Sequence, residues 1–141
     1  MKTKLILMCL TLALLMSFAA CASRKSVEVS CDDFYGDKHI SKQLEVNAGD
    51  SFKVILCSNA STGFSWSESA QISSPDVIEQ TKHEYTTKEY KTTPPPGTAG
   101  QEIWTFKAYS PGTSTISMDY SRPWEGGEKG EWTFNLTVVV K

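Results

Sequence analysis

Hydrophobic residues recur at every second position through much of the chain. The alternation is clearest in four segments, where large apolar side chains alternate with polar or charged ones: residues 51–57, 101–108, 113–120 and 131–141. Successive side chains of a strand point to opposite faces, so this period is typical of antiparallel strands with one buried face. No long segment has the period of an amphipathic helix.

Weaker alternation extends the pattern to residues 27–31, 42–47, 63–69 and 76–84. Turn sequences separate the segments, among them NAGD at 47–50, SSPD at 73–76 and SPGT at 110–113. Seven or eight short strands at this spacing predict an all-β protein, an antiparallel β-sandwich that forms a single domain over residues 27–141.

The first 20 residues have the character of a secretory signal. Lys2 and Lys4 precede an uncharged run over residues 5–20, which is short for a membrane span and has the shape of a signal peptide. Small residues then lead into Cys21 in the sequence FAAC. This resembles the site at which bacterial lipoprotein precursors are cleaved and then lipidated on the new terminal cysteine.

We therefore expect a lipidated tether over residues 21–26 and a lipid anchor in the bacterial cell envelope. Several acyl chains on Cys21 would hold the protein stably, because each buried methylene contributes about 0.8 kcal/mol. Ala22 after the cysteine, in place of Asp, predicts the outer membrane of a Gram-negative cell. The alternative is ordinary cleavage after Ala20 or Ala22, which would give a secreted or periplasmic protein.

Charge argues against one class of partner. Removal of residues 1–20 takes away Lys2 and Lys4, so 12 basic and 16 acidic side chains remain and the formal charge becomes −4. A domain that binds nucleic acid normally carries a basic face. We therefore expect no nucleic-acid partner.

Two cysteines remain for the domain, Cys31 and Cys57, once the signal is removed and Cys21 is lipidated. Each ends an apolar run that is typical of a strand, VEVSC and FKVILC, and an exported protein meets an oxidising compartment. The residues allow a disulfide between them, or two buried free thiols. His39 and His83 are too scattered to complete a zinc pattern, and we expect neither a metal nor a cofactor.

Three stretches depart from the pattern of strands and turns. CSNASTGFSW holds a turn rich in hydroxyls that closes at Gly63, TTKEYKTTPPPGTAGQEIW has three prolines before Gly97 and Gly100, and SRPWEGGEKGEW places Trp124 among glycines and charges. Taken singly, each is explained as a surface loop, or in the case of Trp124 as a lid over the core. Exposed Trp and Arg side chains, however, often dominate the binding energy of protein interfaces.

Together and in this order, the three stretches resemble the chagasin family of cysteine peptidase inhibitors. The family signature is an Asn-Pro-Thr-Thr-Gly loop followed by an aromatic residue and Trp, then a glycine-rich loop, then Arg-Pro-Trp. NASTGFSW, GTAG and RPWE stand at these places here, and the resemblance extends over roughly residues 44–140. It implies an immunoglobulin-like β-sandwich, consistent with the strand pattern.

The resemblance also implies reversible inhibition of papain-like cysteine peptidases by three loops at one end of the sandwich. The first loop (residues 59–63) would approach the catalytic cysteine and histidine, the second (94–100) would lie along the cleft through its backbone, and the third (122–124) would grip the opposite side. The residues expected to contact the peptidase are Asn59, Ser61, Thr62, Gly63, Gly97, Thr98, Ala99, Gly100, Arg122, Pro123 and Trp124.

Three residues depart from the family pattern. Ala60 stands in place of Pro and Ser61 in place of the first Thr, which predicts a less rigid first loop and weaker or differently selective inhibition. Ala99 interrupts the glycine run and would limit how closely the second loop approaches the peptidase.

A rival hypothesis concerns binding without inhibition. The chain has neither a Gly-flanked serine nucleophile nor a metal-ligand spacing, so an enzyme is not expected. The rival is a non-inhibitory immunoglobulin-like surface lipoprotein whose exposed Trp124, Phe64 and Tyr90 bind a glycan or an envelope partner. Under either hypothesis we expect a monomer.

Overall fold

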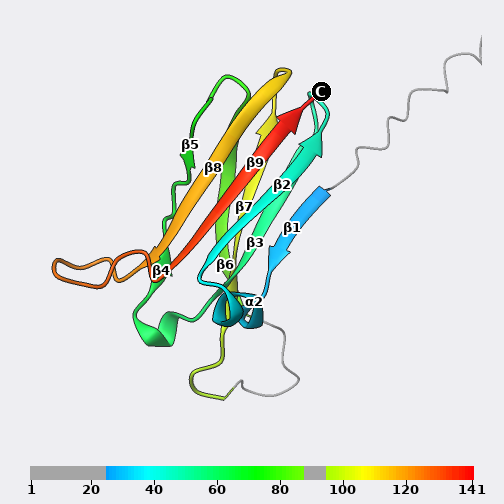
Figure 1. The fold of residues 1–141 in the computed structure, drawn as a ribbon. Helices are drawn as coiled ribbons and strands as arrows, with labels where there is room; N and C mark the ends of the chain where they lie inside the picture. Colours follow the sequence, from blue (N-terminus) through cyan, green and yellow to red (C-terminus); the bar gives the residue numbers. More distant parts are fainter. Residues whose placement is uncertain (1–24, 88–94) are drawn as a thin grey trace, which may run out of the picture.

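The computed structural model describes residues 25–87 and 95–141, which form two β-sheets packed face to face (Figure 1). The first sheet has the strand order β1-β3-β7-β6, and the second has the order β2-β9-β8-β4 with β5 also paired to β8. The strands are β1 Lys25–Val29, β2 His39–Val46, β3 Ser51–Ser58, β4 Ser65–Trp66, β5 Gln71–Ile72, β6 Ile78–Thr86, β7 Gly100–Ala108, β8 Gly112–Ser121 and β9 Trp132–Val140.

The sandwich predicted from the alternation is confirmed, with two corrections. The described residues form nine strands rather than seven or eight. The additional strand is β5, which pairs with β8 but has only two residues, too few to show an alternating pattern in the sequence. The sheets are also not wholly antiparallel: β1 pairs with β3, and β2 with β9, in parallel. A connection that crosses from one sheet to the other between β1 and β2 makes both parallel pairings possible. β1 begins at Lys25, inside the range expected to be a tether.

The core lies between the sheets and follows the alternation closely. In both β7 and β9 every second residue is buried, from Gly100 to Ala108 and from Trp132 to Val140. Large side chains of the two sheets fill the interior: Phe52, Val54, Leu56, Trp104 and Phe106 from the first, and Ile116, Met118, Phe134, Leu136 and Val138 from the second. Fully burying each such side chain contributes about 1.5–3 kcal/mol.

A short helix, α2 (Cys31–Gly36), stands where the sequence predicted the end of a strand. Ser30 accepts a hydrogen bond from the backbone N–H of Asp33, and the carboxylate of Asp33 accepts one from the backbone N–H of Ser30, which is a capping box. The Phe34 ring is buried and stacks on Trp132, with ring centroids 4.9 Å apart. The capping box and this aromatic contact therefore favour a helix from Cys31, where the apolar run predicted the end of a strand.

A disulfide joins Cys31 of α2 to Cys57 of β3, with the Cα atoms 5.1 Å apart. The bond closes a stretch with a sequence separation of 26 residues. Closing a loop of this length restricts the unfolded chain and typically stabilises a fold by about 3 kcal/mol. It also fixes α2 to the strand that leads directly into the first loop.

Four of the connecting segments gather at one end of the sandwich. α2, the first loop, the described part of the β6–β7 connection and the β8–β9 connection all lie at one end, which is the lower end in Figure 1. We call this the loop end. β1 begins toward the opposite end, where Lys25 pairs with Phe52 at the start of β3. The predicted signal segment 1–20, Cys21, Tyr90 and Pro94 lie outside the described residues, in which no helix is long and apolar enough to cross a membrane.

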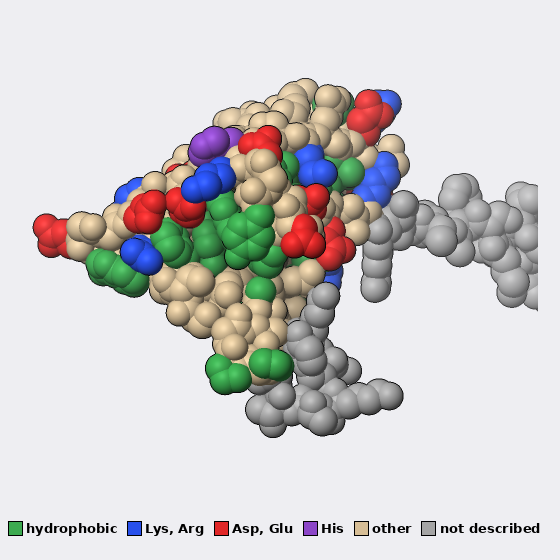
Figure 2. Space-filling model, turned by 60° about the horizontal axis from the view of Figure 1, so that its bottom comes forward, with side chains coloured by type: hydrophobic (Ala, Val, Ile, Leu, Met, Phe, Trp, Pro, Cys, Tyr) green, Lys and Arg blue, Asp and Glu red, His purple; other side chains and the backbone are tan. Residues whose placement is uncertain are grey.

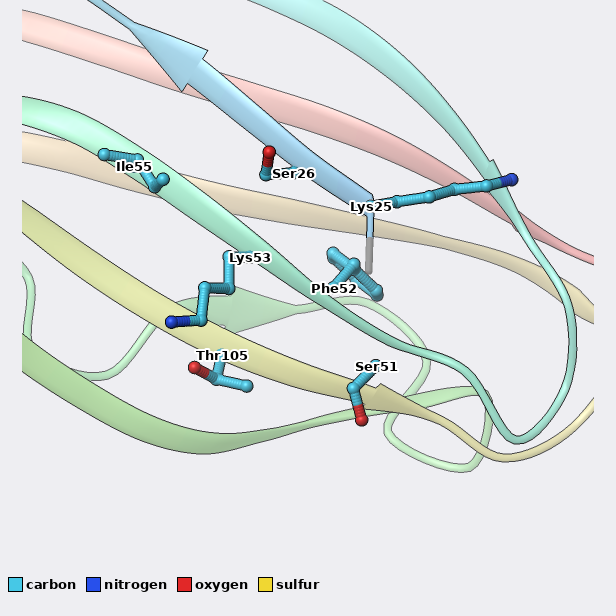
Figure 3. Close-up of a pocket in the computed structure, with 7 residues that line it drawn as sticks. All are labelled: Lys25, Ser26, Ser51, Phe52, Lys53, Ile55 and Thr105. Carbon is cyan, nitrogen blue, oxygen red and sulfur yellow. The ribbon is translucent and has the colours of Figure 1, made fainter. Parts of the chain in front are cut away.

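A hollow of about 440 Å³ opens on the first sheet, toward the end where β1 begins. Lys25, Ser26, Ser51, Phe52, Lys53, Ile55 and Thr105 line it. Figure 3 shows Lys53 and Thr105 close together on neighbouring strands, while Lys25 extends toward β2, where its ammonium donates to the carbonyl of Glu45. This hollow is therefore separate from the loop end.

Candidate functional site

The first loop is a compact turn whose shape is set by its two ends. Residues Ala60–Thr62 form one turn of 3-10 helix, capped by Asn59 at its start and by Gly63 at its end. Gly63 has φ 77°, a left-handed conformation that costs any other L-residue energy. The positive φ at this position therefore explains why a glycine ends the turn, as the sequence predicted.

Asn59 is the main internal support of this loop. Its side-chain oxygen accepts from the backbone N–H of Ser61 at 3.2 Å and from the Ser61 hydroxyl at 2.7 Å. The Thr62 hydroxyl donates to the Asn59 carbonyl at 2.7 Å, and the backbone N–H of Asn59 donates to the Tyr120 hydroxyl at 2.9 Å. The loop is thus held by hydrogen bonds where the family pattern has proline.

The second loop turns sharply at Gly97. The backbone N–H of Thr98 donates to the Pro95 carbonyl at 3.2 Å, and Gly97 has φ 82°. Proline followed by a glycine of positive φ is the pattern of a type II turn. The Asn59 side-chain amide donates to the Gly97 carbonyl at 3.1 Å, so the first and second loops are bonded to each other.

Gly100, one of the residues expected to contact a peptidase, packs closely against β6. It is a buried residue of β7, and a Cβ there would lie 2.5 Å from the Tyr85 hydroxyl and 2.6 Å from the Thr86 carbonyl oxygen. Because glycine has no Cβ, β7 can pack closely against β6 at this position. Gly97 is left as the exposed glycine of this loop, beside the half-buried Thr98 and Ala99.

The third loop carries an exposed tryptophan that rests against the first loop. The Trp124 side chain is 52% exposed, and its ring leaves no room for a Cβ on Gly63, which would lie 2.8 Å from Cη2. The Arg122 guanidinium lies 4.6 Å from the centre of the Phe64 ring and 5.8 Å from that of Trp124. Cation–π contacts of this kind help to order the two rings.

Residues after the third loop hold it in place, and the sequence reasoning missed them. The backbone N–H of Arg122 donates to the Glu128 carbonyl at 2.8 Å, and that of Gly127 to the Trp124 carbonyl at 3.1 Å. The Lys129 ammonium donates to the carbonyls of Arg122 and Trp124. The glycines and charges of EGGEKG therefore form a folded support for Trp124.

A buried carboxylate joins the bases of the first and second loops. Glu102 is 5% exposed and accepts from the Ser58 hydroxyl at 2.7 Å and from the backbone N–H of Trp66 at 3.3 Å. Its second oxygen lies 2.8 Å from Nε2 of His83. The sequence did carry a signal: Glu102 occupies an inward-facing position of the alternation, in phase with Trp104.

Replacing Glu102 with alanine is expected to lower the free energy of unfolding by about 2–3 kcal/mol, because buried donors on Ser58 and Trp66 lose their acceptor. Denaturant unfolding measures this effect. The control is Glu45→Ala, which removes an exposed carboxylate paired with Lys141 and is expected to leave stability nearly unchanged, because exposed ion pairs contribute little. Equal effects of the two variants would contradict a structural role for Glu102.

An ion pair between Lys38 and Glu131 lies at the loop end. The Lys38 ammonium donates to the carboxylate of Glu131 and lowers the pKa of that carboxyl below its ordinary value. Within residues 25–87 and 95–141, no group of His, Cys, Asp and Glu side chains is arranged to hold a metal ion. What the loop end offers is a rigid, partly apolar protrusion for contact with another molecule.

Comparisons with known proteins agree with this geometry. Amoebiasin-2 from Entamoeba histolytica is 29% identical over 125 residues, which cover 79% of this chain and 92% of the relative. The crystal structure of the cysteine protease inhibitor EhICP2 from Entamoeba histolytica superposes with a TM-score of 0.61 at 23% identity, covering 84% of this chain and 98% of that one. PbICP-C, solved in complex with falcipain-2, gives a TM-score of 0.55 at 18% identity, covering 83% and 99%. The two solved structures show a shared fold.

The family model of the chagasin family peptidase inhibitors, I42, matches residues 45–138. This range contains all three loops, strands β3 to β8, the last two residues of β2 and all of β9 except its last two residues. Because the match covers more than half of the chain, it shows that the chain belongs to the chagasin family of peptidase inhibitors and is not an enzyme.

Proposed function

We propose that this family member reversibly inhibits papain-like cysteine peptidases by placing its first, second and third loops in the active-site cleft. The observation that carries the proposal is that loops distant in sequence touch one another at the loop end. Asn59 bonds to Gly97, and Gly63 lies against Trp124. The three loops therefore act as one rigid wedge.

Each loop has a distinct part in the proposed complex. The first loop presents the hydroxyls of Ser61 and Thr62 toward the catalytic cysteine and histidine of the peptidase. The second loop offers backbone groups at Gly97 and Thr98 for hydrogen bonds along the cleft, as an added extended segment does in other peptide recognition. The third loop places Trp124 on the opposite wall.

The internal bonding of the first loop explains how it blocks without being cut. A peptidase needs a carbonyl aligned with its nucleophile, and a misplacement of about 1 Å is costly to the reaction. Here the carbonyls of Asn59 and Ala60 accept backbone hydrogen bonds within the turn itself. Loops ordered before binding also lose little entropy on association, which favours affinity. An interface of about 1,600 Å² is typical of protease inhibitors.

We also propose a lipid anchor at Cys21 in the bacterial envelope. The signal-like residues 1–20 and the FAAC sequence support it. Strand β1 begins near the end of the sandwich opposite the loop end. An anchor a few residues before Lys25 would then leave the wedge pointing away from the membrane.

The rival glycan-binding hypothesis loses part of its basis. Phe64 is half-buried, stacked on Tyr120 with ring centroids 5.4 Å apart, and covered by the Arg122 guanidinium. Tyr90 lies outside the described residues. Trp124 is therefore the one residue of the proposed aromatic set that the described part of the chain leaves widely exposed.

A titration separates the two hypotheses. The protein over residues 22–141, which contains every described element, is added to a fixed concentration of papain. The proposal predicts that activity falls linearly to zero at one inhibitor per enzyme and returns on dilution, with the inhibitor intact. Unchanged papain activity at micromolar concentrations would favour the rival.

Replacing Asn59 with alanine is expected to raise the inhibition constant about tenfold, because the cap of the 3-10 turn and the bond to Gly97 are both lost. Steady-state inhibition of papain measures it. Asn47→Ala, in the turn at the opposite end, is the control: it removes an amide that bonds Asp50 and not a loop of the wedge. An Asn59→Ala protein as potent as the wild type would show that the bond between the loops is dispensable.

A further inference from the structure

A small pocket opens beside the wedge, between the first loop and α2. Its volume is about 150 Å³. Tyr120 and Trp132 form its floor, Tyr35 and Phe64 its walls, and Thr62 and Glu131 part of its mouth. Figure 2, which brings the loop end forward, shows hydrophobic side chains gathered on this surface with acidic and basic side chains around them.

The wall opposite the first loop comes from an element outside the three loops. Tyr35 of α2 is 74% exposed, the largest exposure among the large hydrophobic residues described. Its ring meets Trp132 edge-on, with centroids 5.6 Å apart, and the neighbouring Phe34 is buried against the same indole. Exposure of such a large ring, on the surface proposed to contact the peptidase, is typical of a binding residue.

The ring of Tyr35 is also held in position. The disulfide between Cys31 and Cys57 and the capping box at Ser30 fix the start of the short helix, and the buried Phe34 anchors the residue next to Tyr35. A ring presented on a rigid element loses little entropy when a partner covers it. Tyr35 is therefore preorganised in the same way as Trp124.

We propose that Tyr35 and this pocket form a fourth contact of the inhibitor, which receives one apolar side chain from the rim of the target peptidase cleft. The inference rests on the proposed function. Thr62 belongs both to the first loop and to the mouth of the pocket, so a peptidase that covers the first loop also covers the pocket.

The pocket determines the chemistry of its occupant. Four of the seven lining residues are aromatic, and Asn59, Thr62 and Glu131 supply the rest, so an aliphatic or aromatic side chain fits this pocket better than a charged one. An apolar cavity of about 150 Å³ holds a molecule as large as benzene. Peptidases that carry such a side chain at this part of the rim should be inhibited more strongly, and those with a charged residue there less strongly. Tyr35 is thus a specificity-determining residue.

Inhibition by Tyr35 variants of the protein over residues 22–141 tests the proposal. Tyr35→Ala is expected to raise the inhibition constant for papain-like peptidases by about tenfold, and by different factors for different enzymes. Tyr35→Phe keeps the ring and should inhibit like the wild type. The matched control is Tyr109→Ala, which removes a ring of 51% exposure at the opposite end, and it should leave every inhibition constant unchanged.

Two results would overturn the fourth contact, and they differ in what they leave standing. If Tyr35→Ala inhibits papain and two further peptidases of this class within twofold of the wild type, while Trp124→Ala is impaired, the wedge stands and the fourth contact does not exist. If the wild type inhibits none of them, the proposed function fails, and the fourth contact with it. An unchanged thermal midpoint of Tyr35→Ala would show that any weaker inhibition comes from the loss of the ring contact and not from unfolding of the protein.

A photo-crosslink supplies a readout that does not depend on affinity. A benzoylphenylalanine in place of Tyr35 is expected to crosslink to the rim of the bound peptidase, and the same residue in place of Tyr109 is not. Absence of a crosslink from position 35 in a complex that forms at one to one would overturn the proposal.

Discussion

Replacing Trp124 with alanine is expected to weaken the inhibition of papain by about 100-fold, a loss of about 2–3 kcal/mol of binding free energy. The indole is 52% exposed, and it also packs against Gly63 and Gly127, so the ring is ordered before it meets a partner. Tryptophans of this kind are often the residues on which an interface depends most.

The fold should tolerate this substitution, which makes the result interpretable. Trp124 lies outside the buried core, and the β8–β9 connection keeps its backbone hydrogen bonds. The measurement is the inhibition constant together with the thermal midpoint. The matched control is Tyr109→Ala, because Tyr109 is 51% exposed at the opposite end. Inhibition by Trp124→Ala within twofold of the wild type would remove the third loop from the wedge.

Gly63→Ala is the second substitution with a large expected effect, and it acts on two loops at once. A Cβ at φ 77° costs about 1–2 kcal/mol of backbone strain. The same Cβ would lie 2.8 Å from Cη2 of Trp124, so the indole has to move. We expect the inhibition constant to rise at least tenfold, because the Cβ displaces the ring that should bind the peptidase.

A control at Gly49 distinguishes the effect of backbone strain from the effect of displacing the Trp124 ring. Gly49, in the turn between β2 and β3, has φ 93°, and nothing lies within 4 Å of a Cβ placed on it. Gly49→Ala should therefore lose stability without losing inhibition. If Gly63→Ala loses stability to a similar degree but inhibits like the wild type, the contact between Gly63 and Trp124 has no part in binding.

The alternation of residues was sufficient to predict the sandwich, because burial between two sheets imposes a period of two on every long strand. It could not predict which strands pair in parallel, since successive side chains of a strand point to opposite faces whichever way its neighbour runs. β1 and β2 therefore appeared as strands in the sequence but not as parallel edges of their sheets.

The three loops were recognisable as motifs, but their mutual contacts were not. That Asn59 bonds to Gly97, and that Gly63 faces Trp124, depends on strands that bring residues far apart in sequence to one end. Helix α2 was missed because its six residues are too few to show a helical period. Ser30 and Asp33, which form its capping box, were the signal available in the sequence.

The structure shows how the first loop is held although it departs from the family pattern at Ala60 and Ser61. The position of the family proline is held by Ala60, while Ser61 donates from its hydroxyl to the Asn59 side chain at 2.7 Å. Threonine at position 61 would keep this donor and add a methyl group. The loop is therefore held mainly by polar contacts around Asn59, which is why that residue is the sensitive point of the turn.

The central claim is that the wedge fills the active-site cleft, and protection of the catalytic cysteine tests it most directly. Papain is mixed with an equimolar amount of the protein over residues 22–141 and then exposed to a peptidyl probe that alkylates the catalytic thiol. The account predicts that labelling is blocked in the complex and restored on dilution, and that Trp124→Ala protects far less. Labelling at the same rate with and without saturating inhibitor would contradict it.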